Sequence, residues 1–269
     1  MRTQAEKTAA FRALHQRPGC FLIPNPWDAG TAKILAGLDY EALATTSLGV
    51  ANLLGRANGK VSRAEVVANA REIVEATDLP VNADLENCFA HEPAAAAETI
   101  RLAAEAGLAG GSIEDYSGDA KAAIYDFDLS VERVRAAVAM AKSLPVPFVL
   151  TARAENLIRG RNDMADTIRR LKAYSAAGAE VLYAPGLRTA AEIRAVVEAI
   201  DRPLNVVTGW LEPGITVADV AAAGAKRISV GGSLTWAAVD ALAAAATAIR
   251  NKGDFSSLGS SPPLRAWFT

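Results

Sequence analysis

Acidic side chains follow two neighbouring apolar runs of the sequence. Asp84 and Glu86 come directly after the run Val81–Ala83, and Glu114 follows the next run, Gly111–Ile113. Because alternate residues of an extended segment point the same way, Asp84 and Glu86 can share one face. Converging carboxylates repel one another unless a cation lies among them. Mg²⁺ takes oxygen ligands and completes its shell with water and substrate, so it fits this set best, with Mn²⁺ as the alternative ion. The competing interpretation is that these acids are solvated loop residues paired with arginine or lysine.

Arg153 is the basic residue that ends an apolar run near these acids. A planar guanidinium at that place would hold a substrate carboxylate through two hydrogen bonds. The alternative is an ion pair with Glu155 or Glu114. Both interpretations stay open on the sequence.

Three further segments have weaker chemical signals. Thr45-Thr46-Ser47-Leu48-Gly49 offers hydroxyls and backbone N–H groups suited to a carboxylate or an oxyanion, although Thr and Ser are common after strands. Ser229-Val230-Gly231-Gly232-Ser233 resembles a phosphate cup, or else its glycines are needed for close packing.

Cys88 is either a nucleophile or simply a small residue. No lysine ends an apolar run, which argues against Schiff-base chemistry.

Short apolar runs alternate with amphipathic segments along the whole chain. Each run is nearly continuous in apolar residues, as expected of strands buried on both faces. The eight predicted strands are Cys20–Ile23, Ala42–Thr45, Val81–Ala83, Gly111–Ile113, Phe148–Thr151, Val181–Tyr183, Leu204–Val207 and Arg227–Val230. Ser62 predicts the cap of a helix that ends at Ala76, Ser130 predicts a second cap, and Gly178 and Gly224 mark helix ends.

Eight strands alternating with helices predict an all-parallel sheet, and we expect it to close into a (β/α)₈ TIM barrel. The rival is a doubly wound sheet, but no Gly-x-Gly-x-x-Gly follows the first run. Residues 3–15 predict an extra N-terminal helix, and residues from about 253 an irregular tail. The apolar tail residues Leu264, Trp267 and Phe268 should pack on the barrel or on a neighbour. Residues 1–269 are predicted to form one domain.

The bulk composition excludes several classes of partner. The 269 residues carry a net charge of -2 without a block of like charge, so neither a nucleic acid nor a membrane surface is expected as a partner. The first residues precede no apolar run, so we predict neither a signal peptide nor a membrane span. Two cysteines and two histidines are too few for a disulfide framework or a histidine-based zinc site. A cytoplasmic location is predicted.

The order and spacing of five stretches resemble the isocitrate lyase/phosphoenolpyruvate mutase superfamily over nearly the whole chain. The stretches are Asn25-Pro26-Trp27-Asp28-Ala29-Gly30, Thr45-Thr46-Ser47, Ala83-Asp84-Leu85-Glu86, Ser112-Ile113-Glu114-Asp115 and Thr151-Ala152-Arg153. The resemblance implies a (β/α)₈ barrel whose last helix is exchanged between subunits, in a dimer or a dimer-of-dimers tetramer. It also implies Mg²⁺ and a pyruvate enolate-like intermediate, with a C–C or P–C bond made or broken beside it.

The resemblance assigns roles to individual positions. Asp84, Glu86 and Glu114 fall on the metal-site acids, which act directly or through water. Ser47, with the amides of Leu48 and Gly49, falls on the site of the oxo-acid head, and Arg153 on the carboxylate-binding arginine. Thr46 and Asn205 complete the expected substrate-binding set, and Ser47, Arg153 and Glu114 are the expected catalytic residues.

The departures from the superfamily pattern bear on the reaction. The lyases carry a Cys-containing loop after the fourth strand, where this chain has residues 116–122 with neither Cys nor His. They also have a Glu after the sixth strand, where this chain has Ala184-Pro185-Gly186. Many members place an Asp in the loop after the second strand, and the nearest residue here is Asn58, which cannot act as a base.

Three functions follow. The first is a Mg²⁺-dependent lyase that cleaves a C–C bond in a small 2-oxo acid or hydroxy-diacid. The second is a phosphonopyruvate mutase or hydrolase, for which Lys121, Arg159 and Arg161 are candidate phosphoryl-facing groups. The third is a catalytically silent oxo-acid-binding protein that kept the metal site and lost the acid/base group.

Overall fold

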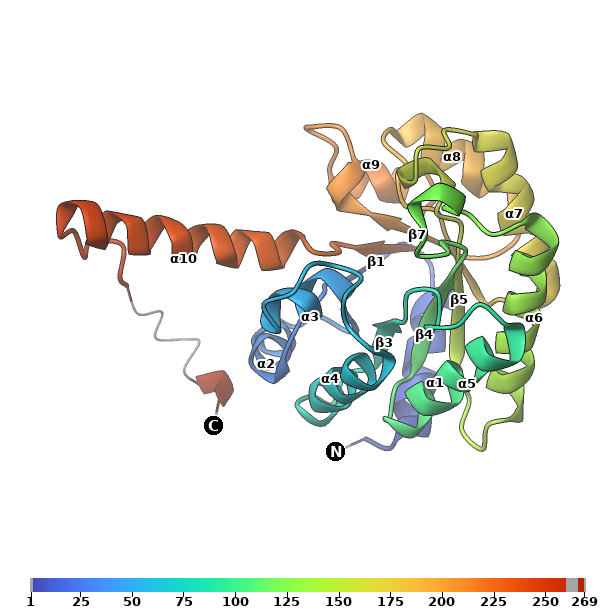
Figure 1. Cartoon of the computed structure of the whole chain (residues 1–269), viewed down its shortest axis with the longest axis horizontal. Coiled ribbons are helices and arrows are strands. Elements are labelled where there is room, and N and C mark those ends of the chain that lie inside the picture. Colours follow the sequence, from blue (N-terminus) through green and yellow to red (C-terminus); the bar gives the residue numbers. More distant parts are fainter. Residues whose placement is uncertain (1, 260–265, 269) are drawn as a thin grey trace.

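The computed structural model describes residues 2–259 and 266–268. Eight parallel strands alternate with helices along the chain (Figure 1). The strands are β1 (Phe21–Ile23), β2 (Leu43–Ala44), β3 (Val81–Asp84), β4 (Gly110–Glu114), β5 (Val149–Arg153), β6 (Val181–Tyr183), β7 (Leu204–Val207) and β8 (Arg227–Ser229). All eight predicted strands are confirmed, most within one residue at each end.

The strands form a nearly closed barrel. Their order is β1-β8-β7-β6-β5-β4-β3-β2, so β1 pairs with β8 and every other neighbour follows the chain. Between β1 and β2 no ladder is present, but the Ala44 amide donates to the Pro24 carbonyl at 3.0 Å and the Asn25 amide group to the Thr45 carbonyl at 3.0 Å. The predicted TIM-barrel architecture is therefore confirmed.

Helices surround the strands, and several of them, including α1, α2 and α4, begin at a side-chain cap. They are α1 (Gln4–Gln16), α2 (Ala29–Gly37), α3 (Ser47–Leu53), α4 (Arg63–Glu75), α5 (Pro93–Glu105), α6 (Phe127–Ser143), α7 (Met164–Ala177), α8 (Ala190–Ala199), α9 (Val217–Ala222) and α10 (Ser233–Lys252). The predicted N-terminal helix is α1, and the predicted capping box at Ser62 opens α4. Gly178 ends α7 in the left-handed conformation, with φ 105°, as its position predicts.

The predicted helix cap at Ser130 is wrong. Helix α6 begins at Phe127, and Ser130 lies one turn inside it. Its hydroxyl donates to the Asp126 carbonyl at 2.9 Å and accepts from the Arg170 guanidinium at 3.0 Å. A serine inside a helix can satisfy its hydroxyl on the preceding turn, so the residue type alone does not locate the helix start.

The barrel has two distinct packing regions. Outward-facing strand residues such as Leu150, Leu182 and Ile228 belong to the main hydrophobic core beneath the helices. At the N-terminal end of the strands, α1 places Phe11 and Leu14 against Phe21 and other inward-facing residues. Above that plug the barrel interior is polar, and its buried inward-facing residues include Asn82, Ser112, Thr151, Asn205, Arg227 and Ser229. Many barrels fill this layer with branched apolar residues, so the polar interior is a feature of this chain.

Helix α10 projects away from the barrel (Figure 1). It contacts α3 near its start, and beyond that Leu242 is 71% exposed. Residues 254–259 form no helix or strand, and Trp267 packs its indole against Gly37 of α2. The expectation that the tail packs on the barrel is thus met by Trp267, whereas Phe268 is 51% exposed and Leu264 lies outside the described residues. In the described chain no helix is both long and apolar enough to cross a membrane.

Candidate active site

A cleft of about 640 Å³ opens at the C-terminal ends of the strands. This is the end of a (β/α)₈ barrel at which catalytic groups gather. The predicted site residues that line the cleft are Thr46, Ser47, Leu48, Asp84, Glu86, Glu114 and Arg153. Gly49 and Asn205 do not line it.

Arg153 lies at the centre of the acidic cluster. Its Nη1 is 3.0 Å from Asp84 Oδ1, and its Nη2 is 3.3 Å from Glu114 Oε2 and 2.5 Å from Glu155 Oε1. The guanidinium also lies 4.6 Å from the centre of the Tyr183 ring. The sequence left open whether Arg153 pairs with acids or binds substrate. In the structure its guanidinium forms ion pairs with the acids. Three carboxylates surround Arg153, and Arg159 adds a second positive charge beside Glu155, so the cluster still has fewer positive than negative groups and favours a cation.

Asp84 ends β3 and is fixed by its backbone as well as its side chain. Its backbone amide donates to the Thr45 hydroxyl at 3.0 Å, which ties β3 to the end of β2. Its Oδ2 accepts the Ser47 amide at 3.2 Å. The carboxylate is therefore shared between a backbone donor and Arg153, at the point where both strands end.

Glu86 is the acid with unused binding capacity. It has a φ of 50°, a left-handed conformation that few non-glycine residues adopt, and this bends the chain back into the cleft. Its Oε1 is buried without a hydrogen-bond partner among the described residues. Burial, with a smaller contribution from Asp84, raises the pKa of Glu86 to about 7. An orphaned buried oxygen beside another carboxylate is what a cation or its bound water would satisfy.

Glu114 is only 6% exposed at the end of β4. Burial, followed by the nearby Glu155 carboxylate, raises the pKa of Glu114 well above its usual range. Arg153 opposes that shift but does not cancel it. The acid therefore lies where a positive charge would stabilise its ionised form.

The three predicted metal-site acids do not form a ready-made cage. Within residues 2–259 and 266–268, no three His, Cys, Asp or Glu side chains are gathered closely enough to hold an ion by themselves. The donor set nevertheless fits Mg²⁺, which often takes one or two carboxylates and several waters. The unpaired Glu86 oxygen is the observation that supports the fit.

The segment after β2 forms the start of α3. Ser47, Leu48 and Gly49 are its first turn, whose amides have no partner inside the helix. The Ser47 amide already donates to Asp84, so this amide and the metal-site acid are coupled. A Cβ at Gly49 would lie 2.6 Å from Trp27 Cβ and 2.7 Å from Thr46 Cγ2, so close packing excludes any larger residue there.

The glycines after β8 are explained by packing. A Cβ at Gly232 would lie 2.2 Å from Leu48 Cδ2, 3.2 Å from its Cγ and 3.3 Å from its Cβ, so the Leu48 side chain would have to shift. Gly231 has a φ of 56°, and its amide donates to Asn25 Oδ1 at 2.9 Å. Of the two interpretations that the sequence left open, the structure favours close packing.

Cys88 is not exposed to the cleft. Its side chain is fully buried, and burial raises the pKa of the thiol to about 12. A protonated thiol in an apolar environment is a poor nucleophile. Of the two interpretations of Cys88, the small buried residue is the one that the structure supports.

A buried network beneath the cluster positions Glu155, which the sequence did not mark as a site residue. The Glu155 amide donates to Asp115 Oδ1 at 2.7 Å, and Asp115 Oδ2 accepts from the Tyr174 hydroxyl at 2.7 Å and from Arg170 Nη1 at 3.1 Å. Glu155 in turn holds Arg153 and, at 3.0 Å, Arg159. Its position two residues after Arg153, just beyond the end of β5, was the available signal.

Loops around the cleft add side chains that the strand ends do not supply. Arg159 stacks its guanidinium 3.6 Å from the centre of the Tyr116 ring. Lys60 and Asn58 line the cleft from the segment after α3, and Trp210 and Trp236 line it from the other side. Among the phosphoryl-facing candidates, Arg159 lines the cleft, whereas Lys121 and Arg161 do not.

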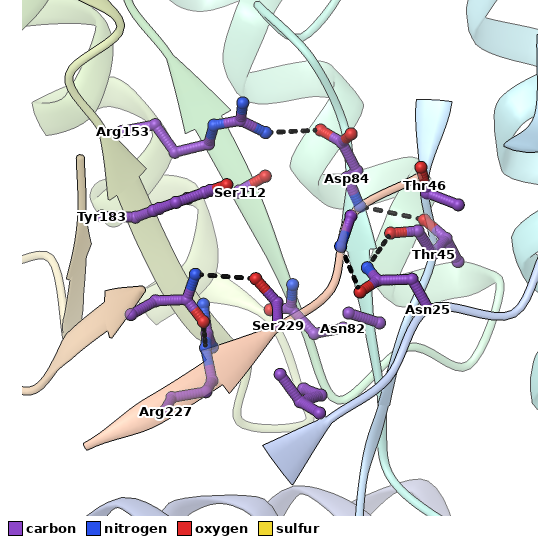
Figure 2. A pocket seen from close by; sticks show the side chains of 14 residues that line it. Asn25, Thr45, Thr46, Asn82, Asp84, Ser112, Arg153, Tyr183, Arg227 and Ser229 are labelled. Atoms are coloured by element: carbon purple, nitrogen blue, oxygen red, sulfur yellow. Dashed lines mark hydrogen bonds and ion pairs between the residues drawn. The ribbon is translucent and has the colours of Figure 1, made fainter. Parts of the chain in front are cut away.

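Asn205 lies below the cleft, in a chamber of about 50 Å³ inside the barrel. Its Oδ1 accepts from Arg227 Nε at 2.7 Å, and its amide group donates to the Ser229 hydroxyl at 3.0 Å. Asp84, Arg153, Tyr183 and Thr46 line both the chamber and the cleft. Figure 2 shows the chamber, with Arg153 and Asp84 joined at one end and Arg227 at the other.

Comparison with known proteins gives consistent results. The family model described as phosphoenolpyruvate phosphomutase matches residues 11–250. A solved structure of a candidate lyase/mutase from Burkholderia cenocepacia J2315 is 52% identical, with a TM-score of 0.96 over 99% of this chain and 96% of that one. An uncharacterised protein of Mycobacterium tuberculosis is 30% identical over 94% of this chain and 93% of its own length. A structure of oxaloacetate acetylhydrolase with its product oxalate is 25% identical, with a TM-score of 0.87 over 98% of this chain and 93% of that one.

Proposed function

The chain belongs to the phosphoenolpyruvate mutase/isocitrate lyase superfamily, and on that premise we propose that it is a Mg²⁺-dependent lyase that cleaves a C–C bond in a small 2-oxo acid or hydroxy-diacid. The superfamily contains lyases, mutases and hydrolases that act on small oxo acids, typically with Mg²⁺. The observation that carries the proposal is the convergence of Asp84, Glu114 and Arg153 from three adjacent strand ends onto the floor of one cleft.

Asp84 is the proposed direct ligand of the ion, with Glu86 and Glu114 reaching it through water. When bound, Mg²⁺ supplies positive charge next to the oxygen on which an enolate develops its negative charge. Arg153 is proposed to bind the substrate carboxylate, and the first-turn amides at Ser47 and Leu48 to orient the oxo-acid head. Glu155 Oε1 accepts from both Nε and Nη2 of Arg153 and so holds the guanidinium in the cluster.

The walls of the cleft support a C–C lyase over P–C bond chemistry. A transferred phosphoryl group needs several cationic donors that are free to face it. Two cleft cations lie outside the acidic cluster. One of them, Arg159, is already paired with Glu155 at 3.0 Å and stacked on Tyr116, which leaves Lys60 as the single cation available to face such a group among the described lining residues. The Trp210 and Trp236 side chains form an apolar wall instead, which suits a hydrocarbon branch of an acid.

A homo-oligomer in the cytoplasm is part of the proposal. Helix α10 exposes Trp236 and Leu242 along its length, and a second copy of the chain would bury them. An exchanged α10 that packs on a partner barrel, in a dimer or a tetramer, accounts for a helix that leaves its own barrel. Sedimentation equilibrium of the full chain tests this assembly, and a monomer at micromolar concentration would refute it.

The reaction is tested with a panel of C4–C6 oxo and hydroxy diacids. Release of pyruvate or glyoxylate is measured with Mg²⁺ and again after EDTA, and phosphonopyruvate is included with phosphate release as its readout. Chelator-sensitive release from a carbon acid supports the lyase, and turnover that ignores the chelator refutes the metal proposal. Tight oxalate binding without turnover of any acid would identify a silent binding protein.

A further inference from the structure

Arg227 is a buried arginine inside the barrel, below the proposed active site. It begins β8 and is 3% exposed. Its Nε donates to Asn205 Oδ1 at 2.7 Å, its Nη2 to the Thr151 hydroxyl at 3.2 Å, and its Nη1 faces His15 Nε2 at 3.4 Å. All three partners are uncharged. They therefore accept hydrogen bonds from the Arg227 guanidinium without neutralising its positive charge.

No carboxylate pairs with Arg227 in the part of the chain that the structure describes. Two other fully buried arginines differ from it. Arg170 pairs with both Asp115 and Asp166, whereas Arg133, which has no acid partner among the described residues, donates to the backbone carbonyls of Asn87, Ala90 and His91. Burial lowers the pKa of Arg227 to about 9, and the positive charge of Arg153 acts in the same direction. Buried charges in proteins are normally paired, so an unpaired arginine is unusual.

His15 supplies no compensating charge. Its Nδ1 lies 2.8 Å from the Phe11 carbonyl, which assigns the ring proton to Nδ1 and leaves the Nε2 lone pair facing Arg227. Burial lowers the pKa of His15 to about 3, so the ring stays neutral at physiological pH. The environment of Arg227 at the closed end of the barrel is therefore fixed and neutral.

The open side of Arg227 faces the chamber of about 50 Å³ (Figure 2). The chamber wall near it consists of Asn205, Ser229, Asn82 and Ser112, which are all buried. The acid that lines the chamber, Asp84, lies at the far end and is compensated by Arg153 at 3.0 Å. This volume holds one or two water-sized particles, since a water occupies about 30 Å³ of liquid.

We propose that the chamber binds one small monovalent anion, of halide or formate size, against the Arg227 guanidinium, with Asn205 and Ser229 beside it. The anion supplies the negative charge beside Arg227 that no described side chain supplies. It reaches the site through the substrate cleft, because Asp84, Arg153 and Tyr183 line both spaces. The proposal concerns the barrel interior and holds whether or not the chain is a lyase.

The test compares thermal unfolding of the full chain in sodium chloride, bromide or formate with unfolding in sodium gluconate at equal ionic strength. Gluconate is too large for the chamber, so it controls for screening. The small anions should raise Tm saturably, by about 3 °C at a tenfold excess over Kd. Equal Tm values in chloride and gluconate would overturn the proposal, and a rise with formate alone would assign the site to carboxylates.

Two variants locate the effect. Asn205→Asp places a carboxylate at the oxygen that accepts the Arg227 Nε–H, so it supplies a built-in counter-ion and should make Tm independent of the anion. Arg227→Met removes the charge and should also abolish the dependence. If the dependence persists in both variants, the anion binds elsewhere and the proposal fails.

Crystals grown in sodium bromide give a direct readout that does not depend on the stability of any variant. Anomalous scattering should show a bromide between Arg227 and Ser229 in the unmodified protein. A bromide-free chamber in those crystals contradicts the proposal.

Discussion

Arg153 Nη1 lies 3.0 Å from Asp84 Oδ1, so the proposed substrate-binding arginine is paired with the proposed metal ligand. A cation and Arg153 would compete for the same carboxylate oxygen. Binding of the cation to Asp84 would therefore release one edge of the guanidinium toward the cleft. This relationship couples the metal site to the carboxylate site.

The first prediction follows from that coupling. Oxalate should bind at least about tenfold more tightly with Mg²⁺ than without it, since coupling between two sites commonly amounts to 5- to 150-fold. Isothermal titration with and without Mg²⁺ measures the ratio. In Arg153→Met the oxalate affinity should fall in both conditions. An oxalate affinity that ignores Mg²⁺ would contradict the coupling.

The second prediction concerns Asp84→Ala. We expect this variant to lose Mg²⁺ binding and activity while it keeps its fold, because removing one of several clustered acids relieves repulsion. Mg²⁺ titration and far-UV circular dichroism measure the two properties. Asp119→Ala, which changes an exposed loop acid outside the cleft, is the matched control. An unfolded Asp84→Ala protein would show that the residue has a structural role instead.

The third prediction concerns the network beneath the site. Arg170→Met removes the cationic partner of the buried Asp115, which keeps only neutral donors, and one of the arginines around Asp166, so it should lower the free energy of unfolding by about 3–5 kcal/mol. Arg101→Met removes a surface arginine that pairs with Glu98 and Glu105, and should change the free energy of unfolding far less, because solvent screens these pairs. Urea denaturation of both variants gives the comparison. Equal losses would show that burial does not decide the strength of these pairs.

The fourth prediction is a pH dependence of stability that originates at His15. Its pKa is about 3 in the folded chain, against 6.5 for an exposed histidine, because burial and then Arg227 disfavour the charged ring. Below pH 6.5 the unfolded chain takes up a proton that the folded chain does not, so stability falls as the pH drops toward 3. The loss from this residue should be about 1.4 kcal/mol per pH unit.

His15→Gln isolates this contribution, since glutamine is neutral at every pH and can still bond to both partners. Between pH 7 and pH 5 the urea midpoint of the unmodified protein should fall relative to that of His15→Gln. Parallel pH profiles would show that His15 does not titrate abnormally.

The fifth prediction concerns the thiols. Cys88 has no exposed surface and its pKa is raised by burial to about 12, so it should not react with iodoacetamide at pH 8 in the folded protein. Cys20 is partly exposed and should be alkylated slowly. Mass spectrometry of intact Cys20→Ser should therefore show no modification until urea is added. Rapid labelling of that variant would contradict the buried position of Cys88.

The order of the strands and the identity of the strand-end residues could be read from the sequence. Continuous apolar runs and capping residues are local signals, so β6 and β7 were predicted to the residue and the cap of α4 at Ser62 was found. Ser130 failed as a cap because a serine bonds equally well to the preceding turn of a helix. The choice of Asp84, Glu114 and Arg153 likewise followed from the rule that parallel strands end at one face.

Tertiary structure alone decided how those side chains are used. Arg153 is held by Asp84, Glu114 and Glu155 at once, and no spacing in the chain specifies that arrangement. The sequence marked Arg227 only as the first residue of a strand, and its burial beside His15 and Asn205 depends on segments about 20 and more than 200 residues away. Local sequence fixes which groups a strand carries, because side-chain direction alternates along it. The ion pairs and the burial of these side chains depend on every strand that lines the barrel interior. The charge state of the site is therefore determined only in the closed barrel.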